Sequence, residues 1–263
     1  MATDSRSRSE KWMSWRMVRT PVESLTCLLR CSTSIRGNGD MKGSSLFVAR
    51  RALLAHFSLI AAGAGAAAIV PVPALAAPAL ILVVGDSLSA EYGLPRGSGW
   101  VALLEQRLAR EKVAASVVNA SISGDTTSGG RSRLPVLLAQ HRPSHVVLEL
   151  GGNDALRGLP LGSTQANLQA MAQAAKAGGA RVLVVGMQVP PNYGRQYAED
   201  FAAVFAKVAK SEGAALVPFL LKGVVDGADP EAMFQADRIH PNAAAHPVML
   251  NNVWPVLRPL LPK

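Results

Sequence analysis

Short apolar runs alternate with amphipathic stretches along the chain from residue 79 onward. The runs are rich in Val, Ile and Leu and do not alternate with polar residues, which is typical of strands buried on both faces. They predict strands at residues 79–84, 113–119, 145–150, 181–187 and 214–218. Apolar residues at helical spacing predict helices at residues 98–108, 128–140, 164–176, 197–212 and over much of 243–260. Strands that alternate with helices predict an α/β fold, with a parallel sheet covered on both faces.

Polar clusters follow the first three predicted strands, and a fourth cluster precedes the last helix. These clusters are Gly85–Ser89, Asn119–Thr126, Gly151–Asp154 and Asp237–Asn242. In a doubly wound sheet the first three converge on one edge, in the crevice where such sheets bind their ligands. Gly85 allows a sharp turn at the end of the first strand, which places Ser87 in that crevice. We therefore predict that Ser87 is a nucleophile.

Asp237 and His240 form the most specific pair in the sequence. Three residues apart in a turn, their side chains can lie on one face, with the carboxylate on Nδ1 of the imidazole. Such a pair is the general base and orienting partner that a serine nucleophile needs. Taken alone, the pair also fits a solvated turn or half of a metal site.

The other polar residues have structural interpretations when each is taken alone. Gly124 fits a turn glycine, and Asn153 with Asp154 fits a helix cap. We expect Asp86 to accept hydrogen bonds from loop N–H groups rather than to act as a catalyst. Glu149 lies in a predicted buried strand, where its carboxylate requires a partner.

Taken together and in this order, the four clusters resemble the motifs of the SGNH (GDSL) hydrolase family. The matching segments are Gly-Asp-Ser-Leu-Ser-Ala, Asn-Ala-Ser-Ile-Ser-Gly-Asp-Thr, Leu-Glu-Leu-Gly-Gly-Asn-Asp and Asp-Arg-Ile-His-Pro-Asn, and the similarity covers about residues 80–258. The resemblance implies a three-layer α/β/α sandwich with a flavodoxin-like, five-stranded parallel sheet of order 2-1-3-4-5. It also implies a serine esterase or thioesterase of the arylesterase, acyl-CoA thioesterase or lysophospholipase type, which uses an acyl-enzyme intermediate and neither a cofactor nor a metal.

The resemblance assigns a role to each matching position. Ser87 matches the nucleophile, His240 the general base and Asp237 its partner. The backbone N–H groups of Ser87 and Gly124 and the side-chain amide of Asn153 match the oxyanion hole. Further positions that support the site or line the substrate loop are Asp86, Asp154, Leu156 and Arg157.

Two details near the nucleophile bear on substrate access and on charge. A helix capped by Ser98 is predicted, and we also expect a helix to begin just after Ser87, where its dipole would favour negative charge. The chain departs from the family pattern at Glu91, where relatives often have glycine, and at residues 96–99.

Charge and cysteine content argue against several other classes of protein. The net charge is +9, but residues 1–76 hold ten Lys and Arg against four Asp and Glu, whereas residues 77–263 hold 17 against 14. The basicity lies mostly in the N-terminal segment, so a nucleic-acid partner is not expected. Cys27 and Cys31 are the only cysteines and both precede residue 77, so the predicted domain needs no disulfide.

The pattern over residues 41–76 is that of a secretory signal peptide. Basic residues precede an almost wholly apolar stretch at 52–70, and Ala74-Leu75-Ala76 supplies a cleavage site. Cleavage after Ala76 would leave residues 77–263 as one hydrolase domain. Residues 1–40 are then either a disordered or a misassigned extension.

This interpretation predicts a periplasmic or secreted monomer that acts on small substrates and keeps no membrane span. The pair Arg50-Arg51 fits twin-arginine export as well as the Sec route. An uncleaved membrane anchor is the competing interpretation, because the apolar stretch approaches the spanning length.

Two other functions remain compatible with the pattern. One is a carbohydrate acetylesterase on the same fold. The other is a non-catalytic, flavodoxin-like binding module whose first loop binds phosphate. The pair Asp237 and His240 separates them, because a phosphate-binding module has no use for it.

Overall fold

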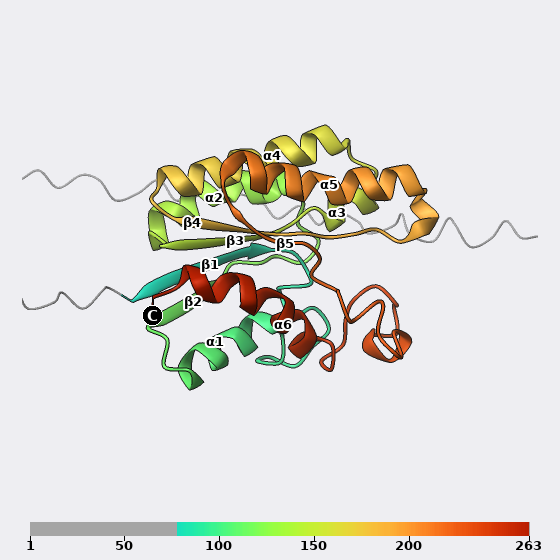
Figure 1. Cartoon of the computed structure of the whole chain (residues 1–263), viewed down its shortest axis with the longest axis horizontal. Helices are drawn as coiled ribbons and strands as arrows, with labels where there is room; N and C mark the ends of the chain where they lie inside the picture. The colour runs from blue at the N-terminus through green and yellow to red at the C-terminus, as the bar shows by residue number, and fades with distance from the viewer. Residues whose placement is uncertain (1–77, 263) are drawn as a thin grey trace, which may run out of the picture. The chain divides into compact units, whose positions relative to one another are not determined.

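The computed structural model of the chain describes residues 78–262 (Figure 1). Five strands form a single parallel sheet of order β2-β1-β3-β4-β5. The strands are β1 Ala79–Gly85, β2 Ala115–Asn119, β3 His145–Glu149, β4 Arg181–Val185 and β5 Ala215–Val217. The predicted strand order is therefore confirmed. The predicted extension at 1–40 and signal peptide at 41–76 lie outside the described residues.

Helices cover both faces of the sheet, which confirms the three-layer α/β/α sandwich (Figure 1). One face carries α1 Trp100–Arg110 and α6 His246–Leu257. The other carries α2 Thr127–His141, α3 Gly152–Leu156, α4 Leu161–Ala177 and α5 Arg195–Glu212. In the described part of the chain, three 3-10 turns complete the elements: η1 Pro191–Tyr193, η2 Glu231–Met233 and η3 Arg258–Leu260. Within residues 78–262, none of the helices combines the length and apolar character needed to cross a bilayer.

The core explains why the apolar runs do not alternate. β3 is buried at all five positions, and β1 is buried at every position except Leu80. Both strands have helices on each face, so side chains that point to either face are buried. Trp100, Phe201 and Phe205 are the largest fully buried side chains, and the two phenyl rings pack edge to face 5.2 Å apart.

The strand register brings the first three polar clusters to one edge of the sheet. Val83 pairs with Asn119, and Gly85 pairs with Glu149. β1, β2 and β3 therefore end close together, as the sequence predicts. The fourth cluster reaches the same edge through the segment between β5 and α6 (Figure 1).

The helix expected directly after Ser87 is absent, and this prediction is wrong. Residues 87–93 form turns, and the next helix is α1, which begins at Trp100. Glu91 and Gly93 both have left-handed backbone, with φ of 58° and 71°, and a right-handed helix cannot continue through them. No helix dipole therefore starts at Ser87.

Ser98 is not the cap of α1, which is a second correction. Its Oγ donates to the carbonyl of Pro95 at 2.6 Å, and the N-cap residue is Gly99. The first N–H groups find other acceptors: Gly99 donates to Glu91 Oε1 at 2.8 Å, and Trp100 donates to His246 Nδ1 at 2.9 Å. The start of α1 is thus held by two side chains from outside the helix.

Candidate active site

Ser87, His240 and Asp237 form a hydrogen-bonded series at the carboxyl edge of the sheet. His240 Nε2 lies 3.0 Å from Ser87 Oγ, and His240 Nδ1 lies 2.6 Å from Asp237 Oδ2. Ser87 comes from the turns after β1, whereas the other two residues lie between β5 and α6, about 150 residues later. The arrangement allows the imidazole to take a proton from the hydroxyl while the carboxylate stabilises the imidazolium.

A tight turn holds Asp237 in place beside His240. Arg238 between them has left-handed backbone, with φ of 58°. The second carboxylate oxygen, Oδ1, accepts the N–H groups of Ile239 and His240, both at 3.0 Å. The hydrogen bond from the His240 N–H leads in lowering the Asp237 pKa to about 2, so the carboxylate stays ionised at neutral pH. Within residues 78–262 no third His, Cys, Asp or Glu joins the pair in a metal-ligand cluster.

The predicted oxyanion donors come from three segments around Ser87: the turns after β1, the loop between β2 and α2, and the first turn of α3. Within the part of the chain that the structure describes, the N–H groups of Ser87 and Gly124 donate no hydrogen bond, which leaves both available to a ligand. Gly124 has φ of 78°, and a Cβ built there would meet only Arg157 Nη2, at 3.8 Å. The glycine is therefore required by its left-handed backbone and not by crowding within the protein.

Asn153 is oriented by the residue that precedes Ser87. Its Nδ2 donates to Asp86 Oδ2 at 3.0 Å, and Asp86 Oδ1 accepts the N–H of Leu88 at 3.0 Å. Asp86 is thus an acceptor for loop groups, as the sequence predicts. Burial raises its pKa to about 6, against the lowering effect of these two hydrogen bonds.

Glu149 lies beneath the nucleophile turn and is fully buried. Its Oε2 accepts the hydroxyl of Ser89 at 2.7 Å and the N–H of Asp86 at 3.3 Å. The Ser89 hydroxyl in turn accepts the indole N–H of Trp100 at 3.1 Å. Burial first, and then the charge of Asp86, raise the pKa of Glu149 well above its ordinary value. The partner that this carboxylate requires is therefore the turn that carries Ser87.

Asp154, Leu156 and Arg157 follow Asn153 but do different things. Asp154 is buried, accepts the N–H of Thr127 at 2.9 Å, and is bound by the Thr127 hydroxyl, so it anchors the start of α2. Leu156 is 52% exposed at the end of α3. Arg157 Nη2 donates to the carbonyl of Gly124 at 2.8 Å. Leu156 and Arg157 therefore lie near the candidate oxyanion hole, whereas Asp154 is buried and holds the start of α2.

Several side chains around the site were not identified from the sequence. The ring of Tyr92 packs on His240 with centroids 4.4 Å apart, and Gln235 Nε2 donates to the carbonyls of Tyr92 and Pro241 at 2.8 and 3.0 Å. These contacts join the nucleophile turns to the segment that carries the histidine. Tyr92 and Gln235 are 143 residues apart, so no local pattern could have paired them.

Four exposed apolar side chains occur in the segments that carry the polar clusters. Tyr92 and Leu156 are about half exposed, as are Ile122, two residues before Gly124, and Ile239, which precedes His240. Of these, Tyr92 is in direct contact with His240, and exposed apolar surface beside polar groups is typical of ligand sites.

A serine, a histidine and an aspartate in series at the carboxyl edge of a parallel sheet are characteristic of a serine hydrolase. Comparisons with known proteins then give the family. Residues 83–248 match the GDSL-like lipase/acylhydrolase family. Esterase TesA from Pseudomonas aeruginosa is 55% identical over 197 residues, which cover 75% of this chain and 96% of that protein. Thioesterase 1/protease 1/lysophospholipase L1 from Escherichia coli K12 is 43% identical over 186 residues, or 71% and 86% of the two chains.

A solved structure agrees with these sequence relatives. A crystal structure of TesA matches with a TM-score of 0.67 and 57% identity, and the match covers 69% of this chain and 99% of that one. The chain belongs to the GDSL-like lipase/acylhydrolase family, and it is a serine hydrolase of ester bonds. The predicted resemblance to the SGNH (GDSL) hydrolases is therefore confirmed, and the non-catalytic binding module loses its support.

Proposed function

We propose that the protein hydrolyses acyl esters and thioesters with Ser87 as nucleophile, His240 as general base and Asp237 as its orienting partner. The observation that carries this proposal is the continuous path from Ser87 Oγ through His240 to Asp237, with distances of 3.0 and 2.6 Å. Ser87 attacks the acyl carbonyl while His240 takes its proton. His240 then returns the proton to the leaving alcohol or thiol, and water releases the acyl group in a second round.

The proposal includes an oxyanion hole made by the N–H groups of Ser87 and Gly124 and the amide of Asn153. Attack on the carbonyl places negative charge on its oxygen, and donors fixed beforehand stabilise that charge without reorganising. The uncommitted N–H groups of Ser87 and Gly124 support this assignment. The hydrogen bond that Asn153 Nδ2 donates to Asp86 also supports this assignment, because it uses one N–H of the amide and leaves the second free to donate.

The substrate class that we propose has an apolar acyl group. Leu156, Ile122 and Ile239 are each 52–54% exposed beside the polar clusters, and burying them against an acyl chain is favourable. The names of the two relatives, an esterase and a thioesterase/lysophospholipase, agree with acyl esters and thioesters. A carbohydrate acetylesterase has less use for such contacts, since an acetyl group buries little apolar surface.

The experiment is hydrolysis of p-nitrophenyl acetate, butyrate and octanoate by protein expressed from the full sequence, beside Ser87→Ala. We expect turnover by the wild type and a loss of at least about 10³-fold in the variant. Val136→Ser, at an exposed position of α2, is the control for handling and folding. Equal rates for the wild type and Ser87→Ala would refute Ser87 as nucleophile.

We further propose that the enzyme is exported, cleaved after Ala76, and acts in the periplasm or outside the cell as a monomer without a nucleic-acid partner. The signal-like pattern at 41–76 and the modest charge of residues 77–263 support this. N-terminal sequencing of the exported protein should find Ala77 first. A first residue before Ala77 would contradict the cleavage site, and a dimer in size-exclusion chromatography would contradict the monomer.

A further inference from the structure

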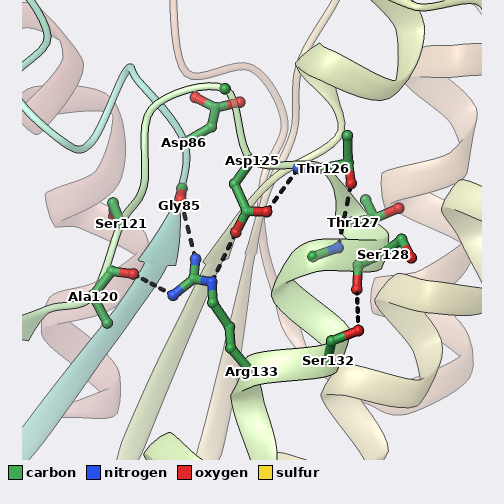
Figure 2. A network of polar contacts seen from close by, with 12 residues as sticks. Gly85, Asp86, Ala120, Ser121, Asp125, Thr126, Thr127, Ser128, Ser132 and Arg133 are labelled. Carbon is green, nitrogen blue, oxygen red and sulfur yellow. Dashed lines mark hydrogen bonds and ion pairs between the residues drawn. The ribbon is translucent and has the colours of Figure 1, made fainter. Parts of the chain in front are cut away.

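The side chain of Arg133 reaches from α2 back to two loops of the candidate active site (Figure 2). Its Nε donates to Asp125 Oδ2 at 2.7 Å, and its Nη2 donates to the carbonyl of Gly85 at 3.3 Å. Its Nη1 donates to the carbonyl of Ala120. The side chains of Arg133 and Asp125 are only 19% and 11% exposed, so the ion pair is largely withdrawn from water.

The three acceptors lie in the two segments that carry Gly124 and Ser87, two of the proposed oxyanion donors. Ala120 and Asp125 bracket Gly124 within the loop between β2 and α2, and Gly85 precedes Ser87 by two residues. One guanidinium thus joins the segments that supply the N–H groups of Gly124 and Ser87. Because the guanidinium is planar and its donors are fixed in direction, it sets the spacing of its acceptors as a flexible ammonium cannot.

Few other contacts hold Gly124, apart from the hydrogen bond that Arg157 Nη2 donates to its carbonyl at 2.8 Å. A Cβ at Gly124 would meet one neighbouring atom at 3.8 Å, so packing does not hold this part of the loop. Asp125 Oδ1 accepts the N–H of Thr126 at 3.0 Å, and the Thr126 hydroxyl accepts the N–H of Gly129 at 3.3 Å, but both contacts are local to the start of α2 (Figure 2). Besides Arg133, two backbone hydrogen bonds link this loop to β1 among the described residues: the N–H of Ala120 donates to the carbonyl of Val83 at 2.9 Å, and the N–H of Ile122 donates to the carbonyl of Gly85 at 3.0 Å.

We propose that Arg133 is a positioning residue that sets the separation of the Gly124 and Ser87 N–H groups, and so determines how well the site stabilises the oxyanion. This inference rests on the proposed function. Arg133 touches neither substrate nor reacting atoms; it acts through the two loops. Removing an oxyanion donor costs about 10²–10³-fold in kcat, and misplacement by about 1 Å can cost about 10²-fold.

The proposal predicts an effect on the transition state with little effect on substrate binding. In the ground state the carbonyl oxygen carries little charge, so a displaced donor scarcely changes its binding. For Arg133→Met we expect kcat to fall by about 10- to 100-fold and KM to change by less than about threefold. Arg133→Lys keeps the charge but cannot reach the three acceptors together, so it should lose activity as well.

The test compares Arg133→Met and Arg133→Lys with Arg131→Met as a matched control. Arg131 lies in the same helix, and its Nη1 donates to Asn167 at 3.1 Å on the surface, away from the two loops. The active-site concentration of each protein is titrated to completion with a p-nitrophenyl phosphonate, which gives kcat per functional site. The inhibition constant of an aryl trifluoromethyl ketone is then measured, because its adduct with a serine carries an oxyanion. The inhibition constant of the ketone should rise in proportion to KM/kcat for the Arg133 variants and stay unchanged for Arg131→Met.

A purely structural role would give a different result. The proposal is overturned if kcat per titrated site and the ketone inhibition constant of Arg133→Met stay within twofold of the Arg131→Met control, even when its melting temperature falls. If Arg133→Met does not fold, Arg133→Lys decides by the same two quantities. Failure of this inference differs from failure of the proposed function, because only the latter leaves Ser87→Ala as active as the wild type.

Discussion

The side-chain amide of Asn153 donates to the carboxylate of Asp86 at 3.0 Å, across the turn that carries Ser87. The two residues are 67 positions apart and follow different strands. A primary amide has two N–H groups, so the one that Asp86 binds fixes the plane of the amide and the direction of the other. Asp86 therefore controls the side-chain donor of the proposed oxyanion hole without facing the substrate itself.

Removing this donor should slow the reaction without harming the fold. We expect Asn153→Ala to lower kcat by about 10²–10³-fold, because one stabilising hydrogen bond to the developing oxyanion is lost. Asn153 is partly exposed, so its truncation leaves no large cavity and the melting temperature should change little. Steady-state kinetics and thermal unfolding of the variant check both parts. An unchanged kcat would remove Asn153 from the site.

Removing the carboxylate of Asp86 should act through Asn153. Asp86→Ala leaves the amide free to turn away, and we expect kcat to fall by about tenfold or more with a small change in KM. The double variant Asp86→Ala/Asn153→Ala should be hardly slower than Asn153→Ala, since a residue that acts through another has no effect in its absence. Additive losses in the double-mutant cycle would show that Asp86 acts independently.

Glu149 should make stability fall as pH rises. Burial raises its pKa in the folded protein, so the folded state keeps a proton that the unfolded state releases above about pH 4.3. The free energy of unfolding then decreases with pH, by at most about 1.4 kcal/mol per unit, up to the folded pKa. The raised pKa of Asp86, about 6, contributes with the same sign between pH 3.8 and 6.

Glu149→Gln provides the measurement. Glutamine keeps an oxygen for the Ser89 hydroxyl and the Asp86 N–H but does not titrate. Urea denaturation from pH 5 to 8 should show the variant gaining stability relative to the wild type as pH rises. Glu105→Gln, at an exposed position of α1, serves as control and should follow the wild type. Parallel curves for the wild type and Glu149→Gln would contradict the prediction.

Because Glu91 has a left-handed backbone, we expect glycine and alanine at this position to differ in their effect on stability. Glu91 accepts the N–H groups of Gly97 and Gly99 at 3.0 and 2.8 Å, and these hydrogen bonds offset its unfavourable φ of 58°. Both Glu91→Ala and Glu91→Gly lose them, but only alanine retains the steric cost of the left-handed conformation. We expect Glu91→Gly to be more stable than Glu91→Ala by about 1 kcal/mol in urea denaturation. The reverse order would mean that the backbone at residue 91 relaxes in the variants.

Leu156 should affect long acyl chains more than short ones. Its side chain is 52% exposed beside the residues assigned to the oxyanion hole, so a long chain can bury part of it whereas an acetyl group reaches less far. We expect Leu156→Ser to lower kcat/KM for p-nitrophenyl octanoate by about 3- to 10-fold and to leave the acetate nearly unchanged. Val136→Ser, another exposed apolar position, is the matched control. An equal loss for both esters would place the effect in the catalytic machinery.

The sequence by itself determined the sheet, because unalternating runs such as 79–84 and 145–150 can only be stable with both faces covered. It also pointed to the pairing of Asp237 with His240, because residues three apart in a turn are close enough for their side chains to meet, as they do here. Ser87, Gly124 and Asn153 were identified by the order of the motifs, which a family resemblance makes specific.

Only the tertiary structure decided which distant side chains support these residues. The register of the sheet and the paths of the loops bring distant segments into contact. Examples are the contacts of Asp86 with Asn153, of Tyr92 with His240 and of Arg133 with Gly85. The prediction of a helix after Ser87 was wrong for a related reason. Residue types alone did not indicate the left-handed backbone of Glu91, which is supported by hydrogen bonds from the N–H groups of Gly97 and Gly99. Local spacing encodes what neighbours in sequence can do, whereas the geometry of this site depends on contacts that exist only once the chain has folded.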